Sequence, residues 1–152
     1  MDAVDHQILA ELQLDGRLTI TELADRLRLS ISRCQRRLRE LERTGVIVGY
    51  HAAVDAAAVG LGFEVLAFVS LRQDQPDTLA AFDKAVAAIP HVIEAQRLFG
   101  DPDYLLRVVT ADLPAYQRLY EEKLVRLPGV RRINSTIVMK QVVPTRPLPS
   151  RP

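Results

Sequence analysis

The sequence predicts an α+β protein with two parts: a winged helix-turn-helix, followed by a ferredoxin-like β-α-β-β-α-β unit. The first third holds three amphipathic stretches, and the turn between the last two is short enough to favour a helix-turn-helix. The remaining two-thirds alternate apolar strand-like runs with helical runs, in the order β-α-β taken twice. A weak internal repeat, "AIPHV" and "RLPGV", ends both helical runs at a spacing of 38 residues.

The composition is that of a folded protein and excludes several classes of site. Of the 152 residues, 48% are hydrophobic and 26% are charged, which is ordinary for a globular chain of one domain or two small ones. A single cysteine excludes an intrachain disulfide, and no Cys/His cluster has metal spacing, so we expect neither metal nor cofactor. The opening "MDAVDHQIL" lacks the basic start of a signal peptide, and no apolar run reaches membrane-spanning length. We therefore expect a cytoplasmic protein without a membrane partner.

Charge is distributed unevenly along a nearly neutral chain. The net charge is +1, yet residues 1–27 sum to −4 and residues 28–43 sum to +4. Five arginines lie within "SISRCQRRLRELERTG", which begins at Ser30 and ends at Gly45. Such a local excess of positive charge indicates either a solvated helix face or an anion-binding face, most simply for DNA.

Three helices are predicted in the first third. The pattern of apolar residues gives one helix over about 2–14 and a short second helix over about 20–27, with a threonine cap. A third helix begins after the cap Ser30, ends near Thr44 and is stopped by Gly45.

The third helix is expected to bury one edge and to present its arginines on the opposite side. At 100° per residue, Cys34, Leu38 and Leu41 fall within about 60° of one another and form the buried edge. On the exposed side, Arg can bond guanine, Gln can bond adenine and Ser can bond a base or a phosphate, as in a helix lying in the major groove. The alternative is a solvated face with pairs such as Arg36–Glu40. The residues predicted to contact double-stranded DNA are Ser30, Ser32, Arg33, Gln35, Arg36, Arg37, Arg39 and Arg43.

The segment after the third helix is predicted to form a wing. In "GVIVGYHAAVD", Val46, Val48 and Tyr50 alternate with other residues, which is typical of a strand. "DAAAVGLG" then reads as a connector. We therefore predict a DNA-binding domain over 1–54 and a linker over 55–61.

The second domain is predicted over 62–143, followed by a disordered tail over 144–152, where four of the nine residues are proline. Its first strand has apolar residues on both faces, whereas helices cover only one face of such a sheet, so a second subunit is expected on the other. The predicted strands are 63–74, 91–98, 103–110 and 130–143, and the predicted helices are 76–89 and 113–126.

The turn "FGDPDYLL" allows three interpretations. It is a hairpin with good turn chemistry, since Gly100 and Asp101–Pro102 favour a tight bend. It is also a candidate small-ligand site, where Asp101 or Asp103 holds an ammonium group and backbone N–H groups hold a carboxylate. A catalytic pair of carboxylates is the third interpretation, which no nearby His, Lys or metal cluster supports.

Taken together, these segments resemble the Lrp/AsnC family, the feast/famine regulators of bacteria and archaea. The resemblance covers residues 1 to about 143. It rests on "VDHQILAELQLDGR", "ITELADRLRLSISRCQRRLRELERTGVIVGY", "FGDPDYLL" and "LPGVRRINSTIVM". Two positions depart from the family pattern: Ile31 stands where proline often follows the first serine of the recognition helix, and Pro102 stands where an aromatic or polar residue is common.

The resemblance implies a DNA-binding transcription regulator whose second domain is of the regulatory type that senses amino acids. It implies dimers formed by face-to-face sheets, assembly into higher homo-oligomers such as tetramers or octamers, and an effector bound between dimers. The effector-binding residues it implies are Gly100, Asp101, Pro102, Asp103, Tyr104, Ser135 and Thr136.

Two rival functions share this architecture. One is a DNA-wrapping architectural protein that responds to no effector. The other is a sirohaem-decarboxylase-like enzyme, for which His91, the one histidine of the second domain, is the candidate group. The intact basic face of the third helix argues against the enzyme.

Overall fold

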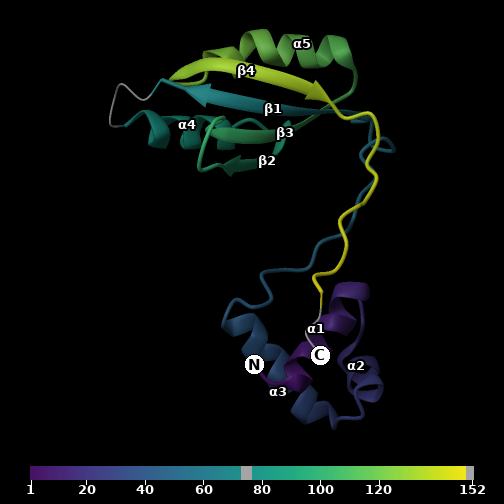
Figure 1. Ribbon diagram of the computed structural model, residues 1–152. Coiled ribbons are helices and arrows are strands. Elements are labelled where there is room, and N and C mark those ends of the chain that lie inside the picture. Colours follow the sequence, from purple (N-terminus) through teal and green to yellow (C-terminus); the bar gives the residue numbers. More distant parts are fainter. Residues whose placement is uncertain (73–76, 150–152) are drawn as a thin grey trace. The chain divides into compact units, whose positions relative to one another are not determined.

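The computed structural model describes residues 1–72 and 77–149, which divide into two compact units (Figure 1). The first unit contains Met1–Ala53 together with the C-terminal segment from Val142, and the second contains Val54–Gln141. Each unit has its own hydrophobic core, and the two cores share no residue. No described helix has the length and apolar character that a membrane crossing needs.

The first unit is the predicted set of three helices, α1 (Ala3–Leu14), α2 (Ile20–Arg26) and α3 (Ile31–Arg43). Asp2, Thr19 and Ser30 are their N-caps, and each side chain accepts a hydrogen bond from a backbone N–H of the first turn, as cap residues do. Five buried residues form the core between the helices: Ile8, Leu23, Ala24, Cys34 and Leu41. Leu38 packs partly buried beside them, so the predicted buried edge of α3 is confirmed.

The turn between α2 and α3 has an unusual residue at its centre. The N–H of Leu29 donates to the Ala24 oxygen (2.9 Å), and the N–H of Arg28 donates to the Asp25 oxygen (3.1 Å). These two bonds are the Schellman pattern that closes a helix, in which the residue after the cap adopts the left-handed conformation and is usually glycine. Here that residue is Arg28, with φ of 53°. A left-handed conformation costs a non-glycine residue about 1–2 kcal/mol.

The segment predicted to form the wing contains no strand. Residues 46–50 form no strand, because the segment folds back onto the end of α3. The N–H groups of Val46 and Ile47 both donate to the Leu41 oxygen, and the Tyr50 hydroxyl donates to Glu42 (3.0 Å). Backbone groups used in this way cannot pair in a ribbon, and Val48 is 91% exposed.

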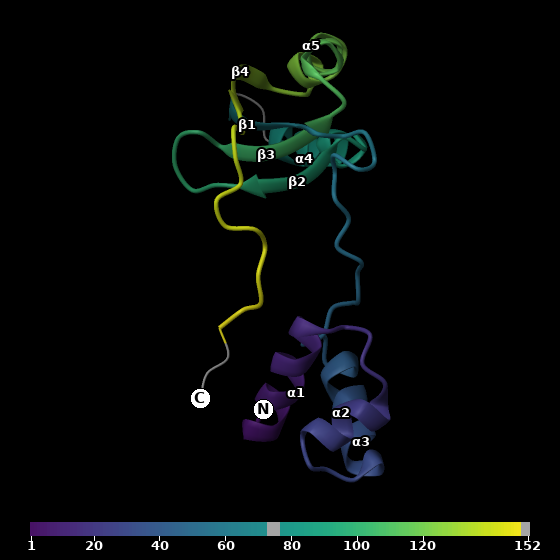
Figure 2. The same ribbon diagram turned by 90° about the vertical axis from the view of Figure 1, so that its right-hand side faces the viewer.

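The second unit has the predicted β-α-β-β-α-β order, and its four-stranded antiparallel sheet has the strand order β2-β3-β1-β4. Both helices lie on one side of the sheet (Figures 1 and 2). The elements are β1 (Phe63–Leu71), α4 (Thr78–Ala87), β2 (Val92–Arg97), β3 (Tyr104–Thr110), α5 (Leu113–Glu122), the 3-10 helix η1 (Leu124–Arg126) and β4 (Val130–Ile137).

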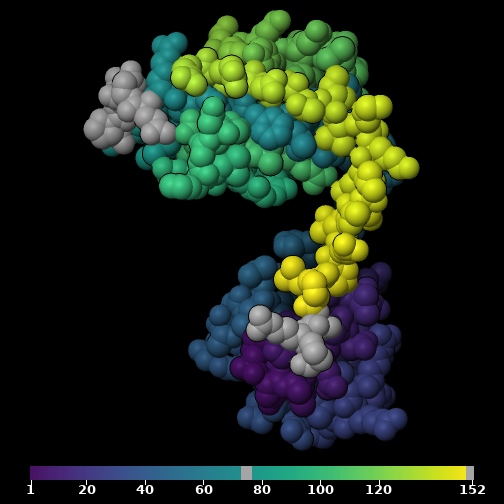
Figure 3. Space-filling model, in the orientation of Figure 1, coloured from purple at the N-terminus to yellow at the C-terminus, as the bar shows by residue number. Residues whose placement is uncertain are grey.

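One face of this sheet is buried by the two helices. Phe82 and Val86 of α4 and Tyr116 and Leu119 of α5 pack on it. Side chains alternate along a strand, so the intervening residues lie on the other face, which we call the open face. In β1, β3 and β4 the open face contains Glu64, Leu66, Phe68, Ser70, Leu105, Arg107, Val109, Arg132, Asn134 and Thr136. In the second unit, yellow-green atoms of β4 form a row along the surface that faces the viewer in Figure 3.

Two predicted elements in this unit extend too far toward the C-terminus. β4 ends at Ile137 because its partner β1 begins at Phe63, and the last bond between them runs from the Val138 N–H to Glu64. α5 gives way to η1 because the chain must become extended at Leu127, before Pro128. The predicted ends of the first strand at 73–74 and of the first helix at 76 lie outside the described residues.

The C-terminal segment contains no helix or strand from 138 to 149. The Leu148 N–H donates to Gln13 Oε1 at 2.7 Å, within the first unit. The disorder expected of the tail stays a prediction, and residues 150–152 lie outside the described part.

Candidate nucleic-acid interface and effector loop

The exposed side of α3 is formed by polar and basic residues near its N-terminal end. Ser32, Arg33, Gln35 and Arg36 are all exposed, and Arg39 continues the same surface one turn later. The Ser30 hydroxyl caps the helix by accepting from the Arg33 N–H (3.4 Å), so the backbone start of α3 is fixed. The arrangement is a rigid helix whose long side chains extend away from its core.

The arginines of α3 divide into paired and unpaired groups. Arg43 donates to both carboxylate oxygens of Glu40 (2.5 and 2.9 Å), but both side chains are more than half exposed, so this pair contributes little stability. Within residues 1–72 and 77–149, Arg33, Arg36 and Arg39 are the α3 arginines that form no ion pair. Their charge is therefore available to an anion.

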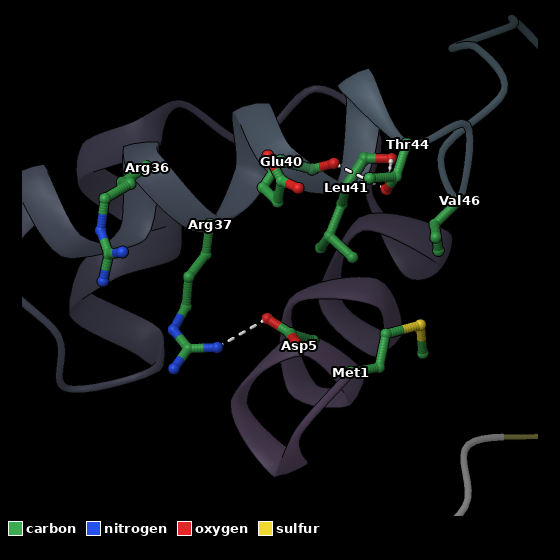
Figure 4. Close-up of a pocket in the computed structure, with 8 residues that line it drawn as sticks. All are labelled: Met1, Asp5, Arg36, Arg37, Glu40, Leu41, Thr44 and Val46. Atoms are coloured by element: carbon green, nitrogen blue, oxygen red, sulfur yellow. Dashed lines mark hydrogen bonds and ion pairs between the residues drawn. The ribbon is translucent and has the colours of Figure 1, made fainter.

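Arg37 contacts α1 instead of solvent. Its guanidinium pairs with Asp5 (2.8 Å), as Figure 4 shows, and with Asp2 (2.6 Å). Its side chain is 19% exposed. Arg37 and Asp5 border a pocket of about 410 Å³ between α1 and α3. The hydrogen bond from Arg37 lowers the pKa of Asp2. Burial raises the pKa of Asp5, but its bonds from the Asp2 N–H and from Arg37 outweigh burial and lower it overall.

This pairing changes the interpretation of one predicted DNA contact. Arg37 is among the arginines predicted to contact DNA, whereas the structure places its charge between the carboxylates of Asp2 and Asp5. Sequence reasoning missed these partners, although Arg37 falls at the border of the buried edge on the helical wheel. The acidic start of α1 was the available signal, because the most N-terminal acids are the ones that meet Arg37.

The predicted effector loop is held to the end of β1 by two aspartates. The Ser70 hydroxyl donates to Asp101 Oδ1 (3.0 Å), and the Leu71 N–H donates to Asp103 Oδ2 (2.7 Å). Gly100 has φ of 138°, a conformation that side chains rarely adopt. Phe99 before it is fully exposed. Asp103 thus already has a structural role, while Asp101 is exposed beside Ser70.

The other predicted effector residues do not converge on this loop within one chain. Tyr104 is buried under α4, where its hydroxyl donates to Asp83 (2.6 Å). Burial, aided by Asp83, raises the pKa of Tyr104 to about 12, so it stays a neutral donor. Ser135 faces the helices and bonds the Tyr116 hydroxyl (2.6 Å). Thr136 lies on the open face.

Comparisons with known proteins agree with both units. Residues 1–48 match a winged helix-turn-helix DNA-binding model, and residues 64–148 match the Lrp/AsnC ligand binding domain. The leucine-responsive regulatory protein of Escherichia coli K12 is 38% identical over 142 residues, covering 93% of this chain and 87% of that protein. This chain belongs to the Lrp/AsnC family.

Solved structures of Lrp/AsnC-type regulators share the whole architecture. A transcriptional regulator of Neisseria meningitidis, crystallised with L-Met, is 36% identical, with a TM-score of 0.93 over 98% of this chain and 96% of that one. An AsnC family transcriptional regulator of Agrobacterium tumefaciens is 34% identical, with a TM-score of 0.91 over 98% and 97%. The chain is thus a DNA-binding transcription regulator with a ligand-binding domain, and these relatives are regulators rather than enzymes.

A first prediction separates the role of Arg37 from DNA contact. We expect Arg37→Met to lower the stability of the first unit at pH 7, because Asp2 and Asp5 lose their partner. Both carboxylates have a pKa below the ordinary 3.8, so their stabilisation is complete above about pH 4 and is lost as the pH falls through the lowered values. The difference in free energy of unfolding between Arg37→Met and the unaltered protein should therefore shrink below pH 4. Cys34, the only cysteine and fully buried, reports unfolding of this unit through its rate of thiol labelling.

The same variant should leave the salt dependence of DNA binding unchanged, since a paired Arg37 releases no counterion. If the slope of log K against log salt concentration became shallower by about 1, Arg37 would instead neutralise a phosphate.

Proposed function

We propose that α3 is the helix of this regulator that lies in the DNA major groove. Ser32, Arg33, Gln35 and Arg36 are then the base-reading residues near its start, and Arg39 contacts phosphate. The observation that carries this assignment is the exposed row Arg33, Arg36 and Arg39, which forms no ion pair within the described residues and lies opposite the buried edge of α3. Charges without an internal partner retain their full attraction for the DNA backbone, and their fixed position on a capped helix allows selective contact with base edges.

The role of Arg36 can be tested directly. Arg36→Ala should weaken binding to the protein's own upstream DNA by about 1–3 kcal/mol and weaken binding to random DNA much less, if Arg36 reads a base. Fluorescence anisotropy over a range of salt concentrations measures both. Arg17→Ala, which removes the same charge from the loop between α1 and α2, is the matched control. Equal losses on the two DNAs would assign Arg36 to phosphate contact only.

We further propose that two copies associate through the open faces of their sheets. Leu66, Phe68 and Leu105 form an apolar centre on that face, where no described helix packs. Glu64 and Arg107 form a bidentate ion pair beside it (2.6 and 3.1 Å), so these two charges neutralise one another. A face of this kind favours burial against an identical copy related by a two-fold axis.

Association through this face predicts the effect of placing a charge at its centre. Phe68→Glu should convert the protein from a dimer or larger assembly to a monomer of 17.0 kDa in light scattering, because two glutamates would be buried near the two-fold axis. Val125→Glu places the same charge on η1, on the helix-covered side, and should leave the assembly intact. An assembly unaffected by Phe68→Glu would exclude the open face as the interface.

A two-fold dimer would present two α3 helices to a near-palindromic site, with half-sites separated by one or more turns of DNA. Higher homo-oligomers, such as tetramers or octamers, would hold several half-sites at once and would bend or wrap the DNA between them. Because its partner is DNA, we place the protein in the cytoplasm.

The effector we propose is an amino acid, bound at the loop Phe99–Asp103. Support comes from the relative crystallised with L-Met and from relatives named as leucine-responsive. In this chain the exposed Asp101 carboxylate, held by Ser70, suits an ammonium group. Tyr104 and Ser135 are hydrogen-bonded to side chains of the helices. Contacts to the effector from outside the loop would therefore come from another copy. The ligand would favour one assembly over another by its difference in affinity for the two.

Asp101→Asn tests the loop. Asparagine keeps the size and the bond to Ser70 but removes the charge, so we expect DNA binding to persist while its response to a pool of free amino acids disappears. Glu122→Gln, at the exposed end of α5, is the control for loss of one negative charge. Retention of the response in Asp101→Asn would remove this carboxylate from the effector site. A parent protein indifferent to the pool would favour an architectural role without effector.

A further inference from the structure

Arg28 occupies a position where this same chain elsewhere uses glycine. After α3, the N–H groups of Gly45 and Val46 donate to the oxygens of Glu42 and Leu41, which repeats the Schellman pattern found after α2. The residue following the cap is left-handed in both turns: Gly45 with φ of 72° and Arg28 with φ of 53°. Glycine adopts this conformation freely and arginine does not, so the turn before α3 carries a backbone strain that the turn after α3 avoids.

Within the described residues, no hydrogen bond or ion pair of the Arg28 side chain offsets this strain. The Arg28 side chain is exposed, and within the described residues it forms no hydrogen bond or ion pair beyond its backbone N–H. By contrast, Arg26, two residues earlier, pairs with Glu11 at 2.9 Å. A strained residue whose side chain supports nothing in its own fold points to a function outside it.

The position of Arg28 indicates the kind of function. It lies two residues before Ser30, the cap of α3, and so directly beside the end of α3 that carries Ser32 and Arg33. It lies outside the helix, however, and cannot enter the groove with it. A long cationic side chain beside a groove-bound helix meets the sugar-phosphate backbone that borders the groove.

We propose that Arg28 is a DNA-binding residue that neutralises a backbone phosphate at the start of α3, and that the strained turn is kept for this contact. The inference rests on the proposed placement of α3 in the major groove. It adds to the row Arg33, Arg36 and Arg39 a fourth unpaired arginine that contributes affinity and register without reading sequence. Its partner is the phosphodiester of double-stranded DNA, whatever the base sequence.

Arg28→Gly separates stability from binding, because the two should change in opposite directions. Relief of strain should raise the Tm of the first unit by a few degrees and slow the labelling of Cys34. Loss of one phosphate contact should make the slope of log K against log salt shallower by about 1, and should weaken binding roughly 8-fold at 0.1 M salt. The loss should be equal on the protein's own upstream DNA and on random DNA.

Two control variants isolate the charge at this position. Arg28→Lys keeps the charge and the strain, so it should bind DNA nearly as well as the unaltered protein and show no gain in Tm. Arg17→Ala removes one charge at the other end of α2 and should change the salt slope little. A more stable Arg28→Gly protein with unchanged DNA binding would overturn the proposal. A loss of DNA affinity equal to that of Arg17→Ala would also overturn it, because that loss would reflect the general charge of the protein. A fall in the Tm of Arg28→Gly would show that Arg28 supports the fold instead.

Measuring DNA binding by Arg36→Ala in parallel separates the role of Arg28 from the proposed placement of α3 in the groove. If both variants leave DNA binding unchanged, the placement of α3 in the groove is wrong. If only Arg36→Ala weakens binding, α3 is placed correctly and the assignment of Arg28 alone fails.

Discussion

Two helices can cover only one face of a four-stranded sheet, and much of this regulator's organisation depends on that limit. α4 and α5 bury the centre of one face, with Phe82 and Leu106 at full burial. The strands β1 and β3, central in the sheet, nonetheless carry apolar residues on both faces. Water is a poor partner for the second face, and we propose that another copy of the chain covers it. The proposed pairing of α3 helices on DNA and the proposed effector site shared between copies would both depend on that cover.

In the first unit, internal pairing decides which charges are available to DNA. Arg26, Arg37 and Arg43 have carboxylate partners and act within the unit, although only Arg37 is largely buried. The acids that lower the net charge of the unit are therefore also the groups that remove certain arginines from solvent. What remains is a small set of unpaired cations around the start of α3. A count of arginines in the sequence overestimates the surface that an anion can reach.

The sequence predicts the regular parts of this structure well, because helix caps and apolar spacing are local signals. Ser30 and Gly45 bound α3 as expected, and the order of elements in the second unit is as predicted. The predictions fail where a contact with another segment determines the structure. β4 stops where β1 begins, the wing segment is hydrogen-bonded to Leu41 and Glu42, and Arg37 forms an ion pair with Asp5 of α1. Single-sequence patterns cannot show such contacts, nor that Tyr104 and Ser135 turn toward the helices.

The separate cores of the two units have a genetic consequence. No buried residue belongs to both cores, so a substitution that disrupts the packing around Ile8 leaves the packing around Phe82 untouched. On the proposed mode of association, a chain with a damaged first unit still joins intact chains and yields mixed assemblies with a missing DNA contact. Alleles of that kind would be dominant over the normal gene. Alleles that unfold the second core would produce chains unable to associate, and these would be recessive.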